Sequence, residues 1–396
     1  MVRQNGSFNL KENSSFLSDP AIEIKQVVNR NDLSRFIEFP YRLYRNEPTW
    51  VPPLRMTQQT LFNPNHLFWR KNPHRFFLAI KNGNPVGRIA AFINHEHNNF
   101  HKSQLGFFGF LESENDESIF ALLLASAESF IKQNNCSEIN GPFNPSLHYE
   151  LGTLINGFEK PPYFMLTHNF NYYDPMIVRA GYSKLKDFYC YKFESSQYKP
   201  TEKMTRVNAY LKQKFNVRIR QGNKDSFDKE LEIFYSIYND AFSGHWGFTP
   251  IDKQEFIHLA KDLKAIVDTR FILIAEINKE PVAFVLCLPN LNEVLINIHN
   301  GKLFPWGIFK LWAGIPRIKT LRVITAAVKS SYDHLGLGAL LYPELIKQAL
   351  EHNFKESELS WIAEGNTKMI SVAEDLGAVN YKTYRVYSKS LSTLES

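Results

Sequence analysis

The residue types and spacing best suited to chemistry lie in the segment 328–352, VKSSYDHLGLGALLYPELIKQALEH. A β-branched run leads there into two glycines, Gly336 and Gly338, and then into an amphipathic helical pattern. Glycines at a strand-to-helix junction let successive backbone N–H groups point at one ligand, and a helix N-terminus adds about half a positive charge. The pattern predicts a pyrophosphate site over residues 332–339. A glycine-capped tight turn without a ligand is the plainer interpretation, and a bare G-x-G favours it.

The elements that must position this loop can be read on both sides of it. We expect a strand at 321–328 before the loop, and a helix at 339–353, a strand at 358–363 and a helix at 368–376 after it. Earlier in the same half, the patterns predict a strand at 215–220, helices at 225–242 and 252–267, and a hairpin at 271–288. Aromatic residues alternate near the end of the chain, which is typical of a closing strand pair.

The two halves of the chain repeat each other, and the repeat predicts the architecture. Four landmarks recur 196 positions apart: Trp50 and Trp246, Pro85 and Pro281, Gly181 and Gly377, Tyr191 and Tyr387. The length of 396 residues also exceeds what one core serves, about 250 to 300 residues. We therefore expect a mixed α/β fold built twice. The expected boundaries are a polar leader at 1–20, a first domain at 21–194, a linker at 195–205 and a second domain at 206–396.

At the loop, the second half resembles the GNAT superfamily of acyl-CoA-dependent N-acyltransferases. The resemblance implies two tandem domains, each with a central mixed, mostly antiparallel sheet flanked by helices. It also implies coenzyme A or acyl-CoA as co-substrate. The residues that it places at the cofactor are Val328, Asp333, His334, Leu335, Gly336, Leu337, Gly338, Ala339 and Asn366.

The sequence departs from the GNAT pattern at three places. Asp333 stands where the family has Arg or Gln, so an acyl carrier protein is an alternative donor to coenzyme A. Ala373 stands where many members have a Tyr that protonates the leaving thiolate, so the general acid is not carried over. In the first half, the corresponding loop at 113–117 is acidic and lacks glycine. We infer a degenerate first domain that shapes an acceptor pocket, and one cofactor site in the second.

A direct attack of an amine on a thioester needs a proton acceptor and a polarised carbonyl, but no covalent cysteine. The candidate bases are Glu364, which follows a predicted central strand, and His299. A solvated turn glutamate and a structural histidine are the alternatives. The candidate acceptor contacts are Trp246, Phe248, Asn300 and Trp306, and packing is the alternative for Trp246.

Three further features could bear on the acceptor. The segment 303–319 combines aromatic and basic residues, which suits a long acyl chain, an interfacial position on a membrane or plain core packing. Asn144, Ser146, His148 and Tyr149 form either a set of acceptor contacts or an irregular loop. Arg88 lies in a hydrophobic strand, and we expect it to pair with a buried carboxylate.

Composition narrows the class of protein. The net charge of +6 comes without any block of five basic residues, which argues against a nucleic-acid binder. Three scattered cysteines support neither a disulfide framework nor a zinc site, and no metal is expected. The first twenty residues lack the apolar stretch of a signal peptide, and no window spans a bilayer. The expected location is the cytoplasm, with the inner membrane face as an option.

The leading hypothesis is an N-acyltransferase that moves an acyl group from acyl-CoA to a small-molecule or lipid amine. The alternatives are a duplicated-GNAT transferase that uses aminoacyl-tRNA and a non-catalytic acyl-CoA-binding module. Phrases spread over the whole chain, such as NEPTWVPPL and NGKLFPWG, also resemble a bacterial duplicated-GNAT family related to the bacterial ceramide synthases.

Overall fold

The computed structural model describes residues 22–200, 202–264 and 266–391, so the predicted leader lies outside the described residues. The elements of the first half are β1 (Ile22–Gln26), α1 (Arg30–Leu43), α2 (Arg55–Leu61), α3 (Leu67–Lys71), β2 (His74–Lys81), β3 (Asn84–Phe92), α4 (His95–His101), β4 (Leu105–Ser113), α5 (Glu117–Gln133), β5 (Glu138–Gly141), β6 (Phe143–Asn144), β7 (Glu150–Leu151), β8 (Thr153–Asn156), α6 (Tyr173–Arg179) and β9 (Ser183–Glu194). Those of the second half are α7 (Glu202–Phe215), β10 (Val217–Gln221), α8 (Phe227–Phe242), α9 (Lys253–Leu263), β11 (Ile272–Ile277), β12 (Glu280–Pro289), α10 (Asn292–Leu295), α11 (Gly307–Gly314), β13 (Thr320–Val328), α12 (Gly338–Glu351), β14 (Glu356–Ala363), α13 (Thr367–Asp375) and β15 (Val379–Ser390).

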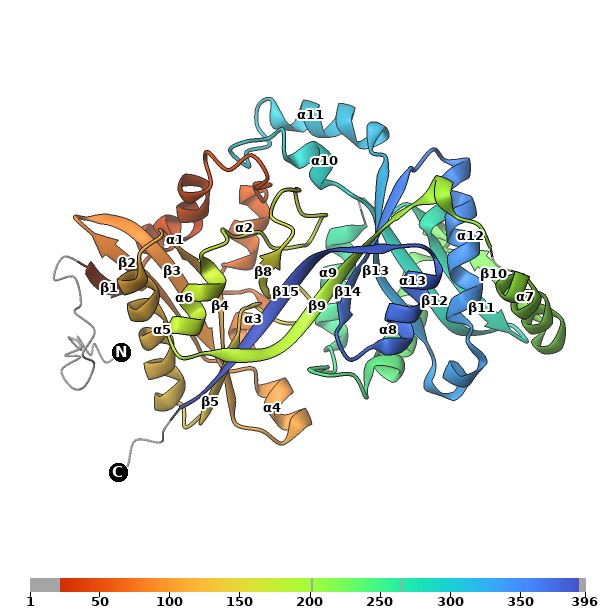
Figure 1. The fold of residues 1–396 in the computed structure, drawn as a ribbon. Coiled ribbons are helices and arrows are strands. Elements are labelled where there is room, and N and C mark those ends of the chain that lie inside the picture. The colour runs from red at the N-terminus through yellow and green to blue at the C-terminus, as the bar shows by residue number, and fades with distance from the viewer. Residues whose placement is uncertain (1–21, 201, 265, 392–396) are drawn as a thin grey trace.

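One continuous sheet runs through both halves, in the order β1-β2-β3-β4-β5-β15-β9-β14-β13-β12-β11-β10 (Figure 1). The order reads the same from both ends once β10–β14 are matched to β1–β5, which confirms the internal repeat. Only β4–β5 and β13–β14 are parallel pairs along this path. The predicted mixed, mostly antiparallel sheet flanked by helices is therefore confirmed.

The last strands of the two halves are exchanged. β9 ends the first half of the sequence but pairs with β14 of the second, and β15 ends the second half but pairs with β5 and β8 of the first. The expected closing strand pair within each half is wrong, because each half contributes one long strand and the pair forms between β9 and β15. The domain boundaries stay predictions, since the exchange places each closing strand in the other half of the sheet.

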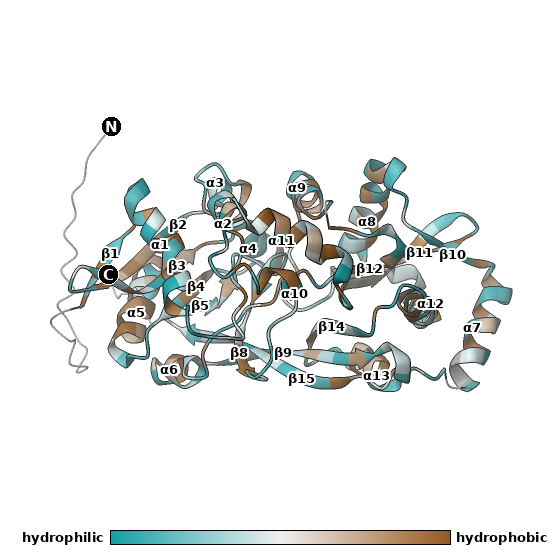
Figure 2. Cartoon of the chain, turned by 90° about the horizontal axis from the view of Figure 1, so that it is seen from above, coloured by the Kyte–Doolittle hydropathy of each residue, from teal (hydrophilic) through white to brown (hydrophobic). Residues whose placement is uncertain are grey.

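Helices cover both faces of the sheet (Figure 2). α1, α2, α3, α8 and α9 lie on one face, called the acceptor face below, and α5, α6, α12 and α13 lie on the other. The apolar core of the acceptor face continues from one half to the other, because Phe188, Cys190 and Tyr384 of the exchanged strands belong to the first half's cluster. On this face of the sheet, residues of both halves therefore pack into one hydrophobic core.

Several local expectations can be compared with the structure. Arg88 is 5% exposed, and its Nη2 atom lies 3.9 Å from Oε1 of Glu112 on the neighbouring strand, as expected. Cys136, Cys190 and Cys287 are free and buried. In the described part of the chain, no helix is long and apolar enough to cross a membrane, and no group of three or more metal-ligand side chains is gathered.

Candidate functional site

The sheet opens into a fork between β13 and β14. The two strands pair only over Thr320–Val323 and Glu356–Leu359, although both continue for several residues. Each strand is bulged where they part: the register of β13 against β12 skips Ile324, and that of β14 against β9 skips Ser360 and Trp361. Bulges bend strands and re-aim backbone groups, and they are common beside active sites. The fork therefore exposes strand backbone that the sheet does not use.

A buried ion pair closes the base of this fork. Arg322 and Glu358 lie opposite each other in the register, and Arg322 Nε is 3.7 Å from Glu358 Oε1. Ser360 accepts a hydrogen bond from Arg322 Nε at 3.0 Å and donates one to Glu358 at 2.6 Å. Burial disfavours the charged carboxylate of Glu358 and raises its pKa, whereas Arg322 and the hydrogen bond from Ser360 stabilise the charged form. The base of the fork is thus rigidly held.

The glycine-rich loop follows directly at the open end of the fork. Leu337 is fully buried and Leu335 packs against the same core, so the two leucines anchor the loop. Gly336 has a φ of +69°, which glycine adopts without strain. A Cβ atom added at Gly336 or Gly338 would meet nothing within 4 Å. The alternation of Leu and Gly therefore turns the leucines inward and leaves the glycine backbone facing open space.

Helix α12 begins at this loop with amides that are not satisfied from within the helix. The first backbone N–H groups of any helix lack an intrahelical acceptor, and those of Gly338 and Ala339 are in this position. No side chain of the described residues caps the N-terminus of α12. At the matching place in the first half, the Asp116 side chain accepts a hydrogen bond from Ser118 N at 2.9 Å and caps α5. Of these two matching helices, only α12 thus offers an uncapped N-terminus to an anion.

Carboxylates hold the loop and occupy its nearby lysines. Asp240 at the end of α8 accepts hydrogen bonds from Ser330 N at 2.5 Å and Ser330 Oγ at 3.0 Å. Asp333 lies 2.6 Å from Nζ of Lys368, which is 79% exposed on α13. Lys329 is similarly paired with Glu280 at 2.7 Å. Asp240 therefore fixes the start of the loop.

The corresponding fork of the first half is filled. β4 and β5 pair only over Leu105–Phe107, so these strands also part. The short strand β6 enters the gap: a Cβ atom added at Gly109 would lie 1.7 Å from the carbonyl oxygen of Phe143. Asn144 Oδ1 accepts a hydrogen bond from Phe110 N at 2.6 Å. The chain's own backbone and an amide side chain thus occupy the place that the second fork leaves open.

Several predicted site residues gather at the same sheet edge as the loop. Glu364 follows β14, and its carboxylate accepts hydrogen bonds from Lys184 Nζ at 2.6 Å and from Asp187 N at 3.3 Å. Asn366 caps α13 by accepting a hydrogen bond from Met369 N at 3.1 Å. The Trp246 ring lies over β9, 5.7 Å from the Phe188 ring and 5.9 Å from Lys186 Nζ. Phe188 is opposite Ala363 in the register, so Trp246 stands beside the open end of β14.

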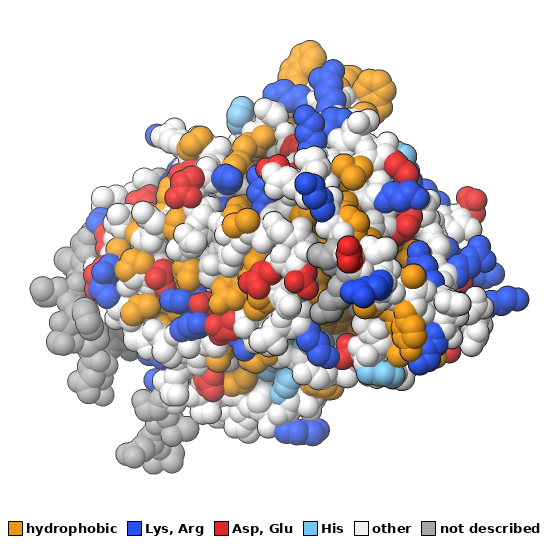
Figure 3. All heavy atoms as spheres, turned by 45° about the vertical axis from the view of Figure 1, so that its right-hand side comes forward, with side chains coloured by type: hydrophobic (Ala, Val, Ile, Leu, Met, Phe, Trp, Pro, Cys, Tyr) orange, Lys and Arg blue, Asp and Glu red, His pale blue; other side chains and the backbone are white. Residues whose placement is uncertain are grey.

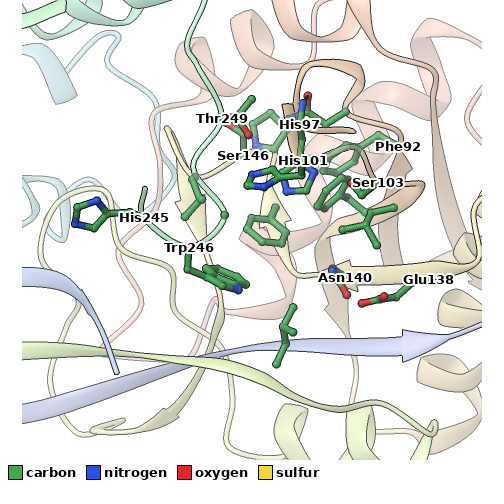
Figure 4. A pocket seen from close by; sticks show the side chains of 18 of the residues that line it. Phe92, His97, His101, Ser103, Glu138, Asn140, Ser146, His245, Trp246 and Thr249 are labelled. Carbon is green, nitrogen blue, oxygen red and sulfur yellow. Dashed lines mark hydrogen bonds between the residues drawn. The ribbon is translucent and has the colours of Figure 1, made fainter. Parts of the chain in front are cut away.

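A cavity of about 430 Å³ lies on the far side of Trp246, between the two halves (Figure 4). Its apolar lining includes Phe92, Phe107 and Leu147, and its polar lining includes His97 and His101 of α4. Burial lowers the pKa of His97 to about 4, so this ring is neutral at pH 7. A cavity of this size with a few polar groups is typical of a small-molecule site.

The polar residues after Gly141 join the two halves. His148 Nδ1 lies 3.1 Å from the Tyr238 hydroxyl and Nε2 lies 3.1 Å from the carbonyl oxygen of Thr249. Since a carbonyl only accepts, Nε2 carries the proton and Tyr238 donates to Nδ1. Tyr149 donates to Glu255 on α9 at 3.1 Å. His148 and Tyr149 therefore link the first half to α8 and α9 across the acceptor face. Ser146 of the same segment lines the cavity.

The remaining predicted contacts lie elsewhere. His299, Asn300 and Trp306 are exposed in the segment before β13, whereas the glycine loop follows β13, a strand about 30 Å long. Phe248 is 5% exposed and packs 5.7 Å from Phe100, behind the cavity wall. Val328 ends β13 opposite Ala283, with its backbone inside the ladder. The structure therefore brings Glu364, Asn366 and Trp246 to the sheet edge where the loop lies, but not His299, Asn300, Trp306 or Phe248.

Sequence reasoning missed two polar groups of the fork. Thr325 Oγ1 and Trp361 Nε1 are buried and have no hydrogen-bond partner among the described residues. Thr325 lies opposite Leu286 of the acceptor-face core, and the Trp361 ring contacts Arg322 and Tyr384 on that same face. A buried unpaired donor costs about 1–3 kcal/mol, so these two atoms, which lie beside the fork, are candidates to donate to a ligand there. The only signal in the sequence was their position in strands beside the loop.

Sequence reasoning also missed Glu150, which lies in β7 over the middle of the sheet. Burial raises its pKa to about 6, although Arg322 acts in the opposite direction and Asn144 donates a hydrogen bond to it. Nothing in the local sequence indicated that this carboxylate would be half-buried.

Known proteins were compared with the chain. The model of the acetyltransferase (GNAT) family matches residues 231–378. Protein YghO of Escherichia coli K12 is 34% identical over 379 residues, which cover 93% of this chain and 95% of YghO. Bacterial ceramide synthase of Caulobacter vibrioides is 34% identical over 368 residues, which cover 91% of this chain and 95% of that enzyme.

Solved structures agree on the fold. A tandem GNAT protein from the clavulanic acid biosynthesis pathway superposes with a TM-score of 0.55 at 11% identity, over 93% of this chain and 98% of that one. A GCN5-related N-acetyltransferase from Sphaerobacter thermophilus gives a TM-score of 0.51 at 11% identity, over 94% and 96%. The chain therefore belongs to the GNAT superfamily of N-acyltransferases, in the family that includes YghO and bacterial ceramide synthase.

Proposed function

We propose that this acyltransferase moves a long-chain acyl group from acyl-CoA to the amine of a long-chain, lipid-like acceptor, and that it does so at the second fork alone. The observation that carries the proposal is the contrast between the two forks. The second is open and ends at an uncapped helix with two glycines facing space, while Asn144 and β6 fill the first. The relative named as a ceramide synthase supports a lipid-like amine as acceptor.

The pyrophosphate of the donor would bind the amides of residues 336–339, where the helix terminus favours negative charge. The thioester would then lie in the fork, with its carbonyl oxygen near the indole N–H of Trp361 or the Thr325 hydroxyl, which lack other partners. A hydrogen-bond donor at that position would polarise the thioester carbonyl and stabilise the negative charge on its oxygen as the tetrahedral intermediate forms. Asn366 would border the same groove, since it begins α13 beside the loop.

The acceptor amine would approach from the acceptor face, past Trp246, and its chain would lie in the cavity between the halves. Glu364 is the predicted residue that stands at this edge of the sheet, and we assign it as the proton acceptor for the attacking ammonium. His299 is the second predicted base, and its distance from the loop leaves it outside this arrangement.

Glu364 also has a structural contact, so its test needs a matched partner variant. E364Q and K184M each break the ion pair between Glu364 and Lys184. If Glu364 accepts the proton, E364Q lowers kcat at least tenfold while K184M keeps most of it. Equal losses in both variants would show that the ion pair matters and the base is elsewhere.

The donor is tested by calorimetric titration of the full-length protein with palmitoyl-CoA and acetyl-CoA, followed by an acyl-transfer assay with long-chain and short amines. The matched variant is G336D, which places a carboxylate at the phosphates: its Cβ meets open space, and aspartate is among the few residues that tolerate a φ of +69°. We expect one palmitoyl-CoA per chain and no binding by G336D.

Three outcomes would redirect the assignment. An aminoacyl-tRNA-dependent enzyme would keep its activity in G336D, because it does not need the loop. An enzyme that uses an acyl carrier protein would transfer acyl groups from that carrier and give no heat with either acyl-CoA. Binding of two donors per chain would contradict the assignment of one working fork.

A further inference from the structure

We propose that α11 and its flanking residues form a docking surface for an anionic lipid bilayer. The surface, called the aromatic ridge below, consists of Phe304, Trp306, Ile308, Phe309, Trp312 and Ile315. It lies at the top of the molecule in Figure 1, in the insertion between β12 and β13. This inference does not rest on the donor or acceptor proposed above.

The aromatic ridge is far more exposed than apolar side chains normally are. Trp312 is 79% exposed, Phe304 and Trp306 are each 73% exposed and Phe309 is 63% exposed. Contiguous apolar patches rimmed by polar residues mark sites of protein or membrane contact. Tryptophan and phenylalanine are the side chains that amphipathic helices place into the interface of a bilayer.

The inner face of α11 explains why the large residues are outside. Gly307 and Gly314 face the protein: a Cβ atom at Gly307 would lie 2.3 Å from the carbonyl oxygen of Lys302, and one at Gly314 would lie 2.6 Å from the Val294 side chain. Leu311 also packs against the core. The helix therefore lies close to the fold through small residues and turns its largest side chains to the outside, the reverse of an ordinary surface helix.

The charge around the aromatic ridge selects an anionic surface. Lys302, Lys310, Arg317 and Lys319 border it and are exposed, and the sequence has no acidic residue between Glu293 and Asp333. Glu293 is turned to the backbone, where it accepts hydrogen bonds from the N–H groups of Lys319 and Thr320. Figure 3 shows basic side chains beside the hydrophobic ones that project at the top of the molecule.

The place of the aromatic ridge in the fold suits an enzyme that works at a surface. The ridge precedes β13 and the glycine loop follows it, so nine extended residues, about 30 Å, separate them. A bilayer at the ridge would leave the loop open to water. The segment is also fixed to the first half, because Arg55 N and Nε donate to the carbonyls of Gly301 at 2.9 Å and Asn300 at 2.6 Å.

The experiment is co-sedimentation of the full-length protein with two kinds of vesicle, one of phosphatidylcholine alone and one that also contains about 30% phosphatidylglycerol. At this content of anionic lipid, each basic residue near the surface should contribute measurably to binding. We expect binding to the anionic vesicles only, weakening as salt is raised. W306A/W312A should lower the partition coefficient at least tenfold. K310Q/R317Q should lower it about fivefold per charge removed.

The matched controls lie on other surfaces. Y210A removes an aromatic side chain that is 53% exposed on α7, and K347Q removes a lysine that is 62% exposed on α12. Both should bind vesicles like the unchanged protein. Thermal denaturation of the variants checks their folding, which should be unaltered because the substituted side chains are exposed.

Two results would overturn the proposal. The first is vesicle binding that W306A/W312A and Y210A reduce equally, or no binding to either vesicle. The second is a dimer in light scattering that W306A/W312A converts to a monomer without any change in vesicle binding, since the ridge would then join two copies of the chain.

Discussion

The charge at Asp333 gives the sharpest test of how the loop treats phosphates. Asp333 stands where the family has a cation or an amide, and its carboxylate lies 2.6 Å from Nζ of Lys368. In D333N the loop loses a negative charge, and Lys368 is released to face a bound phosphate. The Asp333 side chain is 56% exposed and Lys368 is 79% exposed. Because an exposed pair contributes about 0–1 kcal/mol, stability should hardly change.

The gain in donor affinity follows from elementary electrostatics. Two unit charges about 4 Å apart in water interact by about 1 kcal/mol, and a pyrophosphate brings roughly two charges at slightly longer range. Removing the repulsion should therefore improve binding by about 1–2 kcal/mol, which is roughly five- to thirtyfold in Kd. The advantage should shrink in 1 M salt, where the screening length falls to about 3 Å.

Calorimetric titration with coenzyme A at low and high salt measures both effects. The matched control is E351Q, which makes the same change of charge at the other end of α12, about 20 Å away. E351Q should bind like the unchanged protein. If D333N and E351Q bind coenzyme A equally tightly, the phosphates do not lie at this loop. If D333N binds more weakly than E351Q, the carboxylate itself positions the loop.

Three further predictions concern single residues. G338D should leave the melting temperature close to that of the unchanged protein, because its Cβ meets open space, but should weaken palmitoyl-CoA binding in calorimetry at least tenfold by placing a carboxylate at the phosphates; unchanged binding would contradict the anion site. W361F keeps the ring and removes the N–H, so kcat in the transfer assay should fall at least tenfold with little change in donor Kd; an unchanged kcat would refute the role in polarising the carbonyl. Glu150 has a pKa of about 6 in the folded protein against an ordinary 4.5, so its contribution favours folding below about pH 4.5 and is lost as pH rises through 6. E150Q should therefore become more stable relative to the unchanged protein between pH 4.5 and 7 in urea unfolding, by at most about 2 kcal/mol, and a pH-independent difference would contradict this.

The sequence was most informative where one local pattern decides the structure. The hairpin at 271–288, the strand at 321–328 and the glycine turn before α12 depend on neighbouring residues, and all form as expected. The leucines and glycines of the loop also follow a local rule, since their alternation fixes which side of the chain is buried. The repeat then predicted the same mixed α/β architecture in each half.

The sequence was least informative where distant segments meet. The exchange of β9 and β15 leaves no local trace, because either strand fits either edge by its pattern of alternating residues. The filling of the first fork depends on Asn144 meeting Phe110 across 34 positions. The same holds for Thr325 and Trp361, which are ordinary strand residues until the fork removes their partners.

The exchange gives a physical reason for keeping a half whose own fork is closed. β14 forms one wall of the open fork, and its other neighbour in the sheet is β9, which the first half supplies. Trp246 in turn rests on Phe188 of that strand, and His148 and Tyr149 hold α8 and α9 against the acceptor face. The first half therefore supplies a strand beside the open fork, the contacts to α8 and α9, and most of the lining of the cavity, and none of these needs its own fork to be open.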